Sequence, residues 1–429
     1  MAIICNYKPS QFSRAYDTNI CSYILTGTSY TQPNYTIYIE FFCKGIKIGS
    51  QKFYPNSSGV VYVNPTSLYK NYLSPSNQTY DLNLSSTEVT ACPNSLKDFF
   101  MMIYESYGSP PTNHFGYMTP SVYFYNGCQQ FIDYQAMTDG NLQWVINTGA
   151  TGGFLSDISQ VYLGNNDYYN LYFIAGTTIN KIQYLFDVGN SQIAKGPEYM
   201  ESGVEILEQS LTKGNPDVDA FIPPPAPATG TTVIETININ QIGMYYIPIG
   251  PSTINQRIAA PNGWNYCRIS LYYNSTKLNK TDFIIYNVTR DCRYPNYQVF
   301  WLNKHGGYDG MVWDKGNVVK NKIQRDTYKK SLFPNYNFQQ AGELVNNIQV
   351  VEEYTLTTSL LNDQSQSQSI MGMFQSPTIF VLQKVNNVPY TVPYICVDND
   401  VQYLQMVNDL AINYTCTLRP SNQRIEQSY

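Results

Sequence analysis

An alternating segment near the N-terminus constrains the fold more than any other feature of the sequence. Apolar side chains recur at every second position from Tyr35 to Phe41, which is the period of a β-strand with one buried face. Lys44-Gly45 supplies a turn, and "IKIGSQKFY" returns as a second strand. "PNSSG" turns the chain again before "VVYV". Residues 34–73 therefore predict a β-meander, an element that builds β-sandwiches.

The composition extends this prediction to the whole chain of 429 residues. The sequence holds 40 tyrosines, and only 13% of its residues are charged, which is about half the usual share in globular proteins. Tyrosine and β-branched residues favour strands, whereas long surface helices need Glu, Lys and Arg. We therefore predict a mainly β, multi-domain protein of β-sandwich or meander modules with a few short helices.

A proline-rich segment, "DAFIPPPAPATGTT" at residues 219–232, marks the strongest predicted boundary. Proline favours extended polyproline and cannot donate to a β-ladder, so this segment is predicted to be a linker or arm. The predicted divisions are an N-terminal β region at 1–218 (divisible into modules of about 1–90 and 91–218), the linker 219–232, a β module with an aromatic hairpin at 233–345, and a C-terminal β module with one short helix at 346–429. Further short helices are predicted around residues 95–106 and 201–212.

Charge, targeting signals and cysteines narrow the classes of function. The formal net charge of −5 gives no general attraction to nucleic acid. No run of eighteen apolar residues predicts a membrane span, and the first residues, "MAIICNYKPSQF", lack the pattern of a signal peptide. The nine cysteines are scattered and form no C-x-x-C pair, which predicts reduced, buried, structural thiols.

Two histidines, His114 and His305, are the only ones in the sequence, so a histidine-based metal centre or catalytic triad would rest on a single residue. His114 lies in the turn-rich segment "PPTNHFGY". His305 lies in "VFWLNKHGGYDGMVWDKGN", where Trp301 and Trp313 flank a glycine pair and Asp309 occupies a turn position. This pattern predicts a structural hairpin. Motifs for phosphate binding and for a nucleophile elbow are missing from the sequence, so we expect no enzyme, no cofactor and no metal.

The most basic stretch is "KGNVVKNKIQRDTYKKSLFP", which starts at Lys315. Lysine is common where a protein protects an exposed strand edge, so the stretch favours a solvated loop or a strand edge. Contact with an acidic neighbour or with passing DNA is the alternative.

Three segments carry a recognisable pattern. They are "YTQPNYTIYIEFFCKGIKIGSQKFYPNSSGVVYVNPTSLYKNYL", then "YQVFWLNKHGGYDGMVWDKGN", and finally "MGMFQSPTIFVL", "VPYTVPYICVDND" and "DLAINYTCTLRPSNQRI". In this order they resemble tail and baseplate-type structural proteins of phages that infect Bacteroidota, crAss-like phages included. The second segment resembles the W-[IL]-N-x-x-G-G-[WY]-[ED]-x-[FV]-x-[FW] hairpin of that family. Residues 74–220 have no counterpart in the pattern.

The resemblance implies a virion structural protein of the phage tail, made in the host cytoplasm: a ring, collar or hub subunit. Its implied partners are copies of itself in a cyclic homo-oligomer and other tail or portal proteins, with no membrane and with nucleic acid only where the protein lines a DNA channel. Weakly charged, Tyr-rich surfaces suit such contacts. The alternatives are a tail tip or fibre protein that binds glycan on the host surface, and a polysaccharide depolymerase with a carboxylate pair.

Two segments are the expected contact makers of this assembly. The expected interface residues are Phe221, Pro223, Pro224, Pro225 and Pro227 of the arm, and Trp301, Gly306, Gly307 and Trp313 of the hairpin tip.

Overall fold

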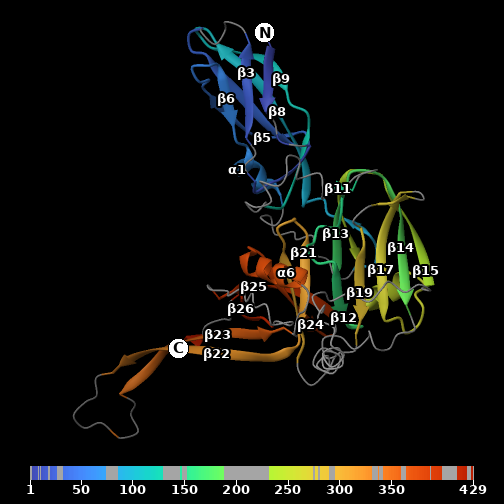
Figure 1. The fold of residues 1–429 in the computed structure, drawn as a ribbon. Helices are drawn as coiled ribbons and strands as arrows, with labels where there is room; N and C mark the ends of the chain where they lie inside the picture. Colours follow the sequence, from blue (N-terminus) through green and yellow to red (C-terminus); the bar gives the residue numbers. More distant parts are fainter. Residues whose placement is uncertain are drawn as a thin grey trace, which may run out of the picture. The chain divides into compact units, whose positions relative to one another are not determined.

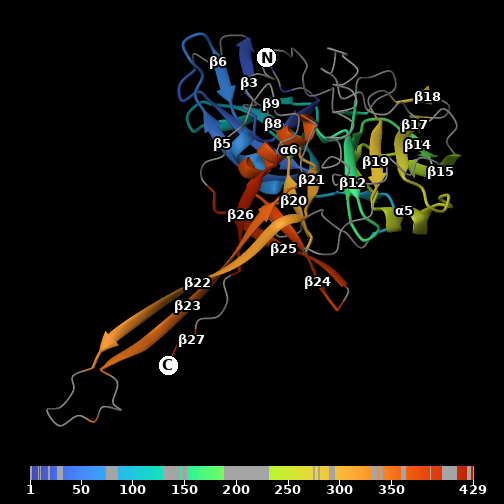
Figure 2. The same ribbon diagram turned by 60° about the horizontal axis from the view of Figure 1, so that its bottom comes forward.

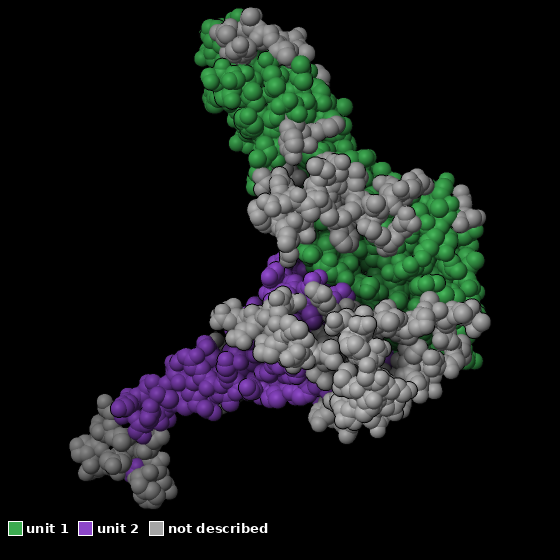
Figure 3. All heavy atoms as spheres, in the orientation of Figure 1, with its two compact units in different colours: residues 1–194, 227–287, 303–309 green, residues 195–226, 288–302, 310–429 purple. Residues whose placement is uncertain are grey.

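The computed structural model is mainly β, as the sequence predicts. Its described residues form five sheets, three short α-helices and one 3-10 turn (Figure 1). They divide into two compact units, unit 1 at residues 1–194, 227–287 and 303–309, and unit 2 at residues 195–226, 288–302 and 310–429 (Figure 3). The structure describes residues 2–128, 145–146, 152–187, 231–288, 295–398 and 413–428, apart from gaps at 8, 10, 18–19, 27–31, 74–85, 274–275, 279–280, 331–336, 338–341, 359–363, 387 and 423–426.

The first sandwich of unit 1 packs a three-stranded sheet on a six-stranded sheet. The first sheet has the order β1 (Ala2–Tyr7), β3 (Cys21–Thr26), β6 (Val60–Val63). The second has the order β2 (Phe12–Arg14), β10 (Val122–Tyr125), β8 (Leu96–Tyr107), β4 (Thr36–Cys43), β5 (Ile46–Phe53), with β9 (Thr112–Met118) also paired to β8. Tyr23 and Val61 of the first sheet and Ile39 and Ile103 of the second share one buried core. Helix α1 (Thr66–Tyr69) and the 3-10 turn η2 (Lys70–Tyr72) follow β6.

The predicted meander is confirmed for its first two strands. β4 and β5 form an antiparallel hairpin, and Gly45 adopts a φ of +77° in the turn between them. Ile37 and Ile39 are buried, as the alternation predicts. The third strand, β6, instead pairs with β3 in the opposite sheet.

The helix predicted around residues 95–106 is wrong, because this segment is strand β8. β8 lies between β10 and β4 and pairs with both. Its side chains alternate, with Phe99, Met101 and Ile103 in the core of the sandwich. The helix predicted at 201–212 lies outside the described residues.

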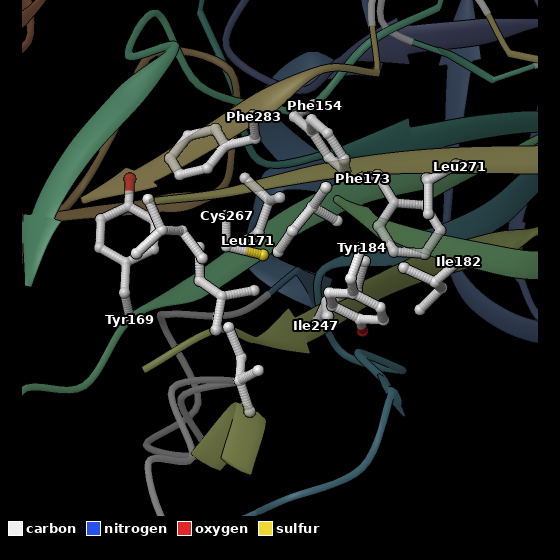
Figure 4. Close-up of a cluster of buried hydrophobic side chains, with 14 of the residues drawn as sticks. Phe154, Tyr169, Leu171, Phe173, Ile182, Tyr184, Ile247, Cys267, Leu271 and Phe283 are labelled. Carbon is white, nitrogen blue, oxygen red and sulfur yellow. The ribbon is translucent and has the colours of Figure 1, made fainter. Parts of the chain in front are cut away.

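The second sandwich of unit 1 has the larger core. One sheet has the order β11 (Val145–Ile146), β13 (Asn170–Ala175), β16 (Gly243–Pro248), β7 (Thr90–Ala91). The other has the order β12 (Gln160–Leu163), β19 (Phe283–Asn287), β17 (Tyr266–Tyr273), β14 (Ile179–Asp187), β15 (Thr231–Ile239), with β18 (Thr276–Lys277) paired to β17; helix α5 (Pro251–Arg257) follows β16. Phe173 and Phe283 come from opposite sheets, and both meet the ring of Phe154 edge to face (Figure 4).

The boundary predicted at 219–232 differs from the structure. β14 precedes that segment, β15 begins within it, and the two strands pair antiparallel, with Tyr184 opposite Val233. β12 and β19 also pair across it, in parallel. The residues before and after the proline-rich segment therefore complete one sandwich, and neither part buries its apolar face alone.

Unit 2 is built on an eight-stranded sheet covered by one helix. The sheet has the order β21 (Tyr308–Trp313), β20 (Tyr297–Leu302), β24 (Ile379–Val385), β25 (Val388–Cys396), β26 (Thr415–Pro420), β23 (Glu343–Thr357), β22 (Lys315–Lys329), with β27 (Gln427–Ser428) paired to β23. Helix α6 (Gln364–Gln375) places Ile370 and Met373 in the core of the sheet. The predicted Gln/Ser-rich helix and the aromatic hairpin are thus confirmed.

The cysteine prediction holds for most of the described thiols. Five of the eight described cysteines are buried. Cys5 and Cys396 are partly exposed, and Cys128 is exposed. Cys292 lies outside the described residues.

Candidate interaction surfaces

The two tryptophans of the aromatic hairpin are core residues of unit 2. Trp301 of β20 and Trp313 of β21 are each 0% exposed, and both belong to the cluster that contains Ile370 of α6. Their side chains are therefore covered by this chain itself, a position that differs from the interface role expected for them.

The hairpin tip at residues 303–309 is fixed by one asparagine. Oδ1 of Asn303 accepts hydrogen bonds from the backbone N–H of His305 at 3.0 Å and of Gly307 at 3.1 Å. Its Nδ2 donates to the carbonyl of Leu155 at 2.7 Å. The oxygen of this buried amide thus accepts two hydrogen bonds and its nitrogen donates one, and all three set the shape of the tip within unit 1.

The glycine pair is required by close packing. Gly306 has a φ of +86°, and a Cβ there would lie 1.5 Å from the carbonyl oxygen of Asn126. A Cβ on Gly307 would lie 2.8 Å from the carbonyl oxygen of Leu155. Gly306 is thus required both by its positive φ and by close packing, whereas Gly307 is required by close packing alone. Both glycines are buried, so they too are covered within the chain.

His305 forms a buried pair with an acidic residue. Its Nε2 lies 2.8 Å from Oδ1 of Asp157, whose Oδ2 lies 3.2 Å from Nζ of Lys304. Burial lowers the pKa of His305, so its imidazole is neutral at pH 7 and donates from Nε2. Burial by itself would raise the pKa of Asp157, but the hydrogen bonds of His305 and Lys304 and the positive charge of Lys304 outweigh it and lower that pKa.

Asp309 lies in strand β21 and not at the turn position that the sequence suggests. It is 1% exposed in β21, and its Oδ1 accepts from the Ser156 hydroxyl at 2.6 Å and from the Tyr169 hydroxyl at 3.4 Å. The Ser156 hydroxyl therefore serves Asp309 and is not aligned on His305 as a nucleophile would be. The arrangement around the tip is a set of structural hydrogen bonds.

The second histidine lies on a strand rather than in a loop. His114 is exposed on β9, where its ring stacks on Tyr107 at 4.7 Å between centroids. Its Nε2 lies 3.0 Å from Oγ1 of Thr112.

One small cavity lies in the first sandwich of unit 1. Its volume is about 20 Å³, which is room for a single water molecule. Its wall is apolar and includes Tyr23, Tyr69, Phe99 and Phe124. It is too small to hold a sugar ring or a cofactor.

Unit 2 has an exposed two-stranded extension, called the ribbon here and defined as β22 paired with residues 343–355 of β23. The two strands run on beyond β26, their neighbour in the sheet, and the short strand β27 pairs with them only at Asn347 and Ile348 (Figure 2). Nearly every residue of β22 is exposed. Of the two structures that the sequence favours for the basic stretch, a solvated loop or a strand edge, residues 315–329 form the strand edge. Large apolar side chains are nevertheless exposed on the ribbon, namely Val318, Val319, Ile323, Tyr328 and Val345.

The expected interface residues of the arm, from Phe221 to Pro227, lie outside the described residues. The remaining four, Trp301, Gly306, Gly307 and Trp313, lie in one hairpin and are all buried. The ribbon was not among the expected interface residues. The sequence signal that could have indicated it is the mixture of Val and Ile with lysine in "VVKNKI" at residues 318–323.

No protein-family model matches the sequence, and no curated protein matches it. None of the described helices combines the length and apolarity needed to cross a membrane.

Proposed function

We propose that this protein is a structural subunit of a phage tail, a ring, collar or hub component that acts by assembly and not by catalysis. It assembles through contacts with copies of itself and with neighbouring tail proteins. The three sequence segments that resemble Bacteroidota phage tail proteins support this proposal.

The exposed ribbon is the observation that carries the proposal. An isolated two-stranded hairpin is marginally stable in water, and an exposed strand with apolar side chains is prone to unwanted pairing. The ribbon combines both properties where β22 pairs with residues 343–353 of β23, because β26 pairs only with Tyr354–Thr357 and β27 only with Asn347 and Ile348. Such a segment fits a protein whose ribbon is covered in the assembled state.

The weakly charged surface is a second support. Charged residues are depleted at the centre of protein interfaces, where tyrosine is enriched. This chain has 40 tyrosines against 57 charged residues in total, since it holds 26 Lys and Arg and 31 Asp and Glu. A surface of this kind loses little solvation energy when other subunits cover it.

Imaging of virions tests the proposal directly. A phage that carries an affinity tag on this protein is purified and labelled with gold-conjugated antibody, and negative-stain class averages are calculated. Label at a fixed level of the tail, repeated around its axis, is the expected result. Particles without label, together with a purified protein that cleaves capsular polysaccharide until one Asp→Asn change abolishes the cleavage, would overturn it.

A further inference from the structure

The ribbon has two faces of different chemistry. Because side chains alternate along a strand, residues opposite one another in the β22–β23 register share a face. Face A holds Val319, Asn321, Ile323, Arg325, Thr327 and Lys329, opposite Tyr354, Glu352, Val350, Ile348, Val345 and Glu343. Face B holds Val318, Lys320, Lys322, Gln324, Asp326 and Tyr328, opposite Thr355, Glu353, Val351, Gln349, Asn347 and Leu344.

The middle of face A is apolar, whereas the middle of face B is polar. Ile323 pairs with Val350 on face A, and Ile323 is 48% exposed. Face A also continues the face that holds the core of unit 2, because Tyr354 packs against that core. The apolar face of the sheet therefore runs on along the ribbon, where Val319, Ile323 and Val345 stay exposed.

The charges of face A complement those of face B when two ribbons lie parallel and in register. Arg325 of one copy then lies over Asp326 of the next. Glu352 of one copy lies over two cross-strand pairs of the next copy, the pair of Lys320 with Glu353 and the pair of Lys322 with Val351. Glu353 has the same charge as Glu352, but it is neutralised within its own copy, because its Oε1 lies 2.7 Å from Nζ of Lys322.

The apolar residues also meet in this register. Ile323 and Val350 of one copy lie over Val351 and the aliphatic stem of Lys322 of the next copy. Val345 of the first copy lies over Tyr328 and Leu344 of the next. A face A against face B contact uses two different surfaces of the same chain, so it is heterologous and can close into a ring.

The size of the contact favours a ring over a pair. The projecting part of the ribbon is about 40 Å long and about 10 Å wide, from about 3.3 Å per residue and about 4.8 Å between strands. One contact thus buries about 800 Å² in total, which is below the size of a stable specific interface. In a closed ring each copy makes two such contacts.

We propose that the ribbon binds the ribbon of a second copy of this chain, with face A of one copy on face B of the next, so that parallel ribbons line up around a ring. This inference rests on the proposed function and names the partner of that assembly.

Charge reversal of the full-length protein tests the inference. Glu352→Lys alters face A and Lys320→Glu alters face B, and each variant alone sets like charges opposite one another. Sedimentation velocity over a range of concentrations is expected to show an association constant lowered at least about tenfold for each variant. An equal mixture of the two variants restores association, since each altered face then meets a complementary one. Lys52→Glu, an exposed residue of β5, is the matched control and leaves association unchanged.

Each other outcome overturns the inference. Wild-type protein that stays monomeric at every concentration excludes self-association through the ribbon. Variants that associate like wild type, or a mixture that does not restore association, exclude the A-on-B contact. If Glu352→Lys fails to fold, Ile323→Asp on the same exposed face replaces it. A mixture of Ile323→Asp with Lys320→Glu forms at most a pair, because only one contact then joins two unaltered faces. If the gold label is found on the tail but the charge-reversal variants associate like the wild type, the proposed function stands and only the ribbon contact is excluded.

Discussion

Nε2 of His305 lies 2.8 Å from Oδ1 of Asp157, although the two residues are 148 positions apart in the sequence. His305 is 2% exposed, and Lys304 holds the other oxygen of the same carboxylate. The pair therefore anchors the hairpin tip within unit 1 by a hydrogen bond between a neutral imidazole and an ionised carboxylate.

The stability of the tip is expected to depend on pH. Burial lowers the pKa of His305 in the folded protein below its ordinary value of 6.5, so the unfolded chain binds a proton more readily. The contribution of this group is complete above pH 6.5 and is lost as the pH falls from 6.5 toward the lowered pKa. Asp157 has a lowered pKa as well, so its own contribution is lost only as the pH falls below its ordinary value of 3.8.

Hydrogen exchange of the backbone amides at residues 303–309, measured from about pH 7 to about pH 5, tests this dependence across the ordinary histidine range. Protection, corrected for the intrinsic rate, is expected to fall with pH in the wild type. His305→Gln keeps a donor near Asp157 but cannot titrate, so its protection is expected to vary less. If protection falls equally steeply with pH in the wild type and in His305→Gln, His305 is not the group that causes the pH dependence.

Gly306→Ala is expected to destabilise unit 1 by about 3 kcal/mol or more, because it adds an unfavourable φ and a clash with backbone. The added Cβ would lie 1.5 Å from the Asn126 carbonyl oxygen. Gly45→Ala is the matched control, since Gly45 has a φ of +77° but no atom within 4 Å of the added Cβ. It is expected to cost about 1 kcal/mol. Urea unfolding of both variants measures the difference, and equal losses would show that packing at the tip is unimportant.

Trp313→Ala is expected to lower the free energy of unfolding of unit 2 by about 3–5 kcal/mol, as for other buried aromatic residues. Tyr390→Ala removes an aromatic side chain that is 51% exposed on β25, and it is expected to change stability by less than about 0.5 kcal/mol. Thermal unfolding compares the two. If Trp313→Ala leaves stability intact but prevents incorporation into particles, Trp313 is an interface residue after all.

Alkylation of the native protein is expected to modify Cys128 first among the described cysteines, because it is exposed. Burial raises the pKa of Cys21 to about 11, and it raises the pKa values of Cys267 and Cys416 well above the ordinary range. These thiols are therefore protonated at pH 7 and shielded from reagent. Peptide mass mapping after a short treatment with iodoacetamide reads out the order. Early labelling of Cys267 would indicate that the second sandwich opens locally.

Local alternation was enough to predict strands such as β4, because the charged Glu40 lies between the buried Ile39 and Phe41 and makes the period visible. The same rule failed for β8. Phe100, Met102 and Tyr104 point away from the core but are themselves apolar, so "FFMMIY" has no visible period and can equally belong to a helix.

Long-range pairing and the setting of the hairpin tip could not be predicted from sequence. The prolines of residues 219–232 signal a break in local structure, but whether the flanking strands join one sheet depends on which partners complete the core. His305 was predicted at a turn on the strength of its glycines. Nothing near Asp157 in the sequence marks it as the acceptor, since the two residues are 148 positions apart and meet only in the folded protein.

The pairing of β7 with β16, Thr90–Ala91 with Tyr245–Tyr246, has a consequence for synthesis of the chain. A ribosome releases the amino end first, so the first sandwich is complete once Tyr125 has emerged. More than a hundred further residues must then be synthesised before β16, the pairing partner of β7, is available. The second sandwich consequently matures late, and a nascent chain arrested near the prolines leaves finished and unfinished modules on the same polypeptide.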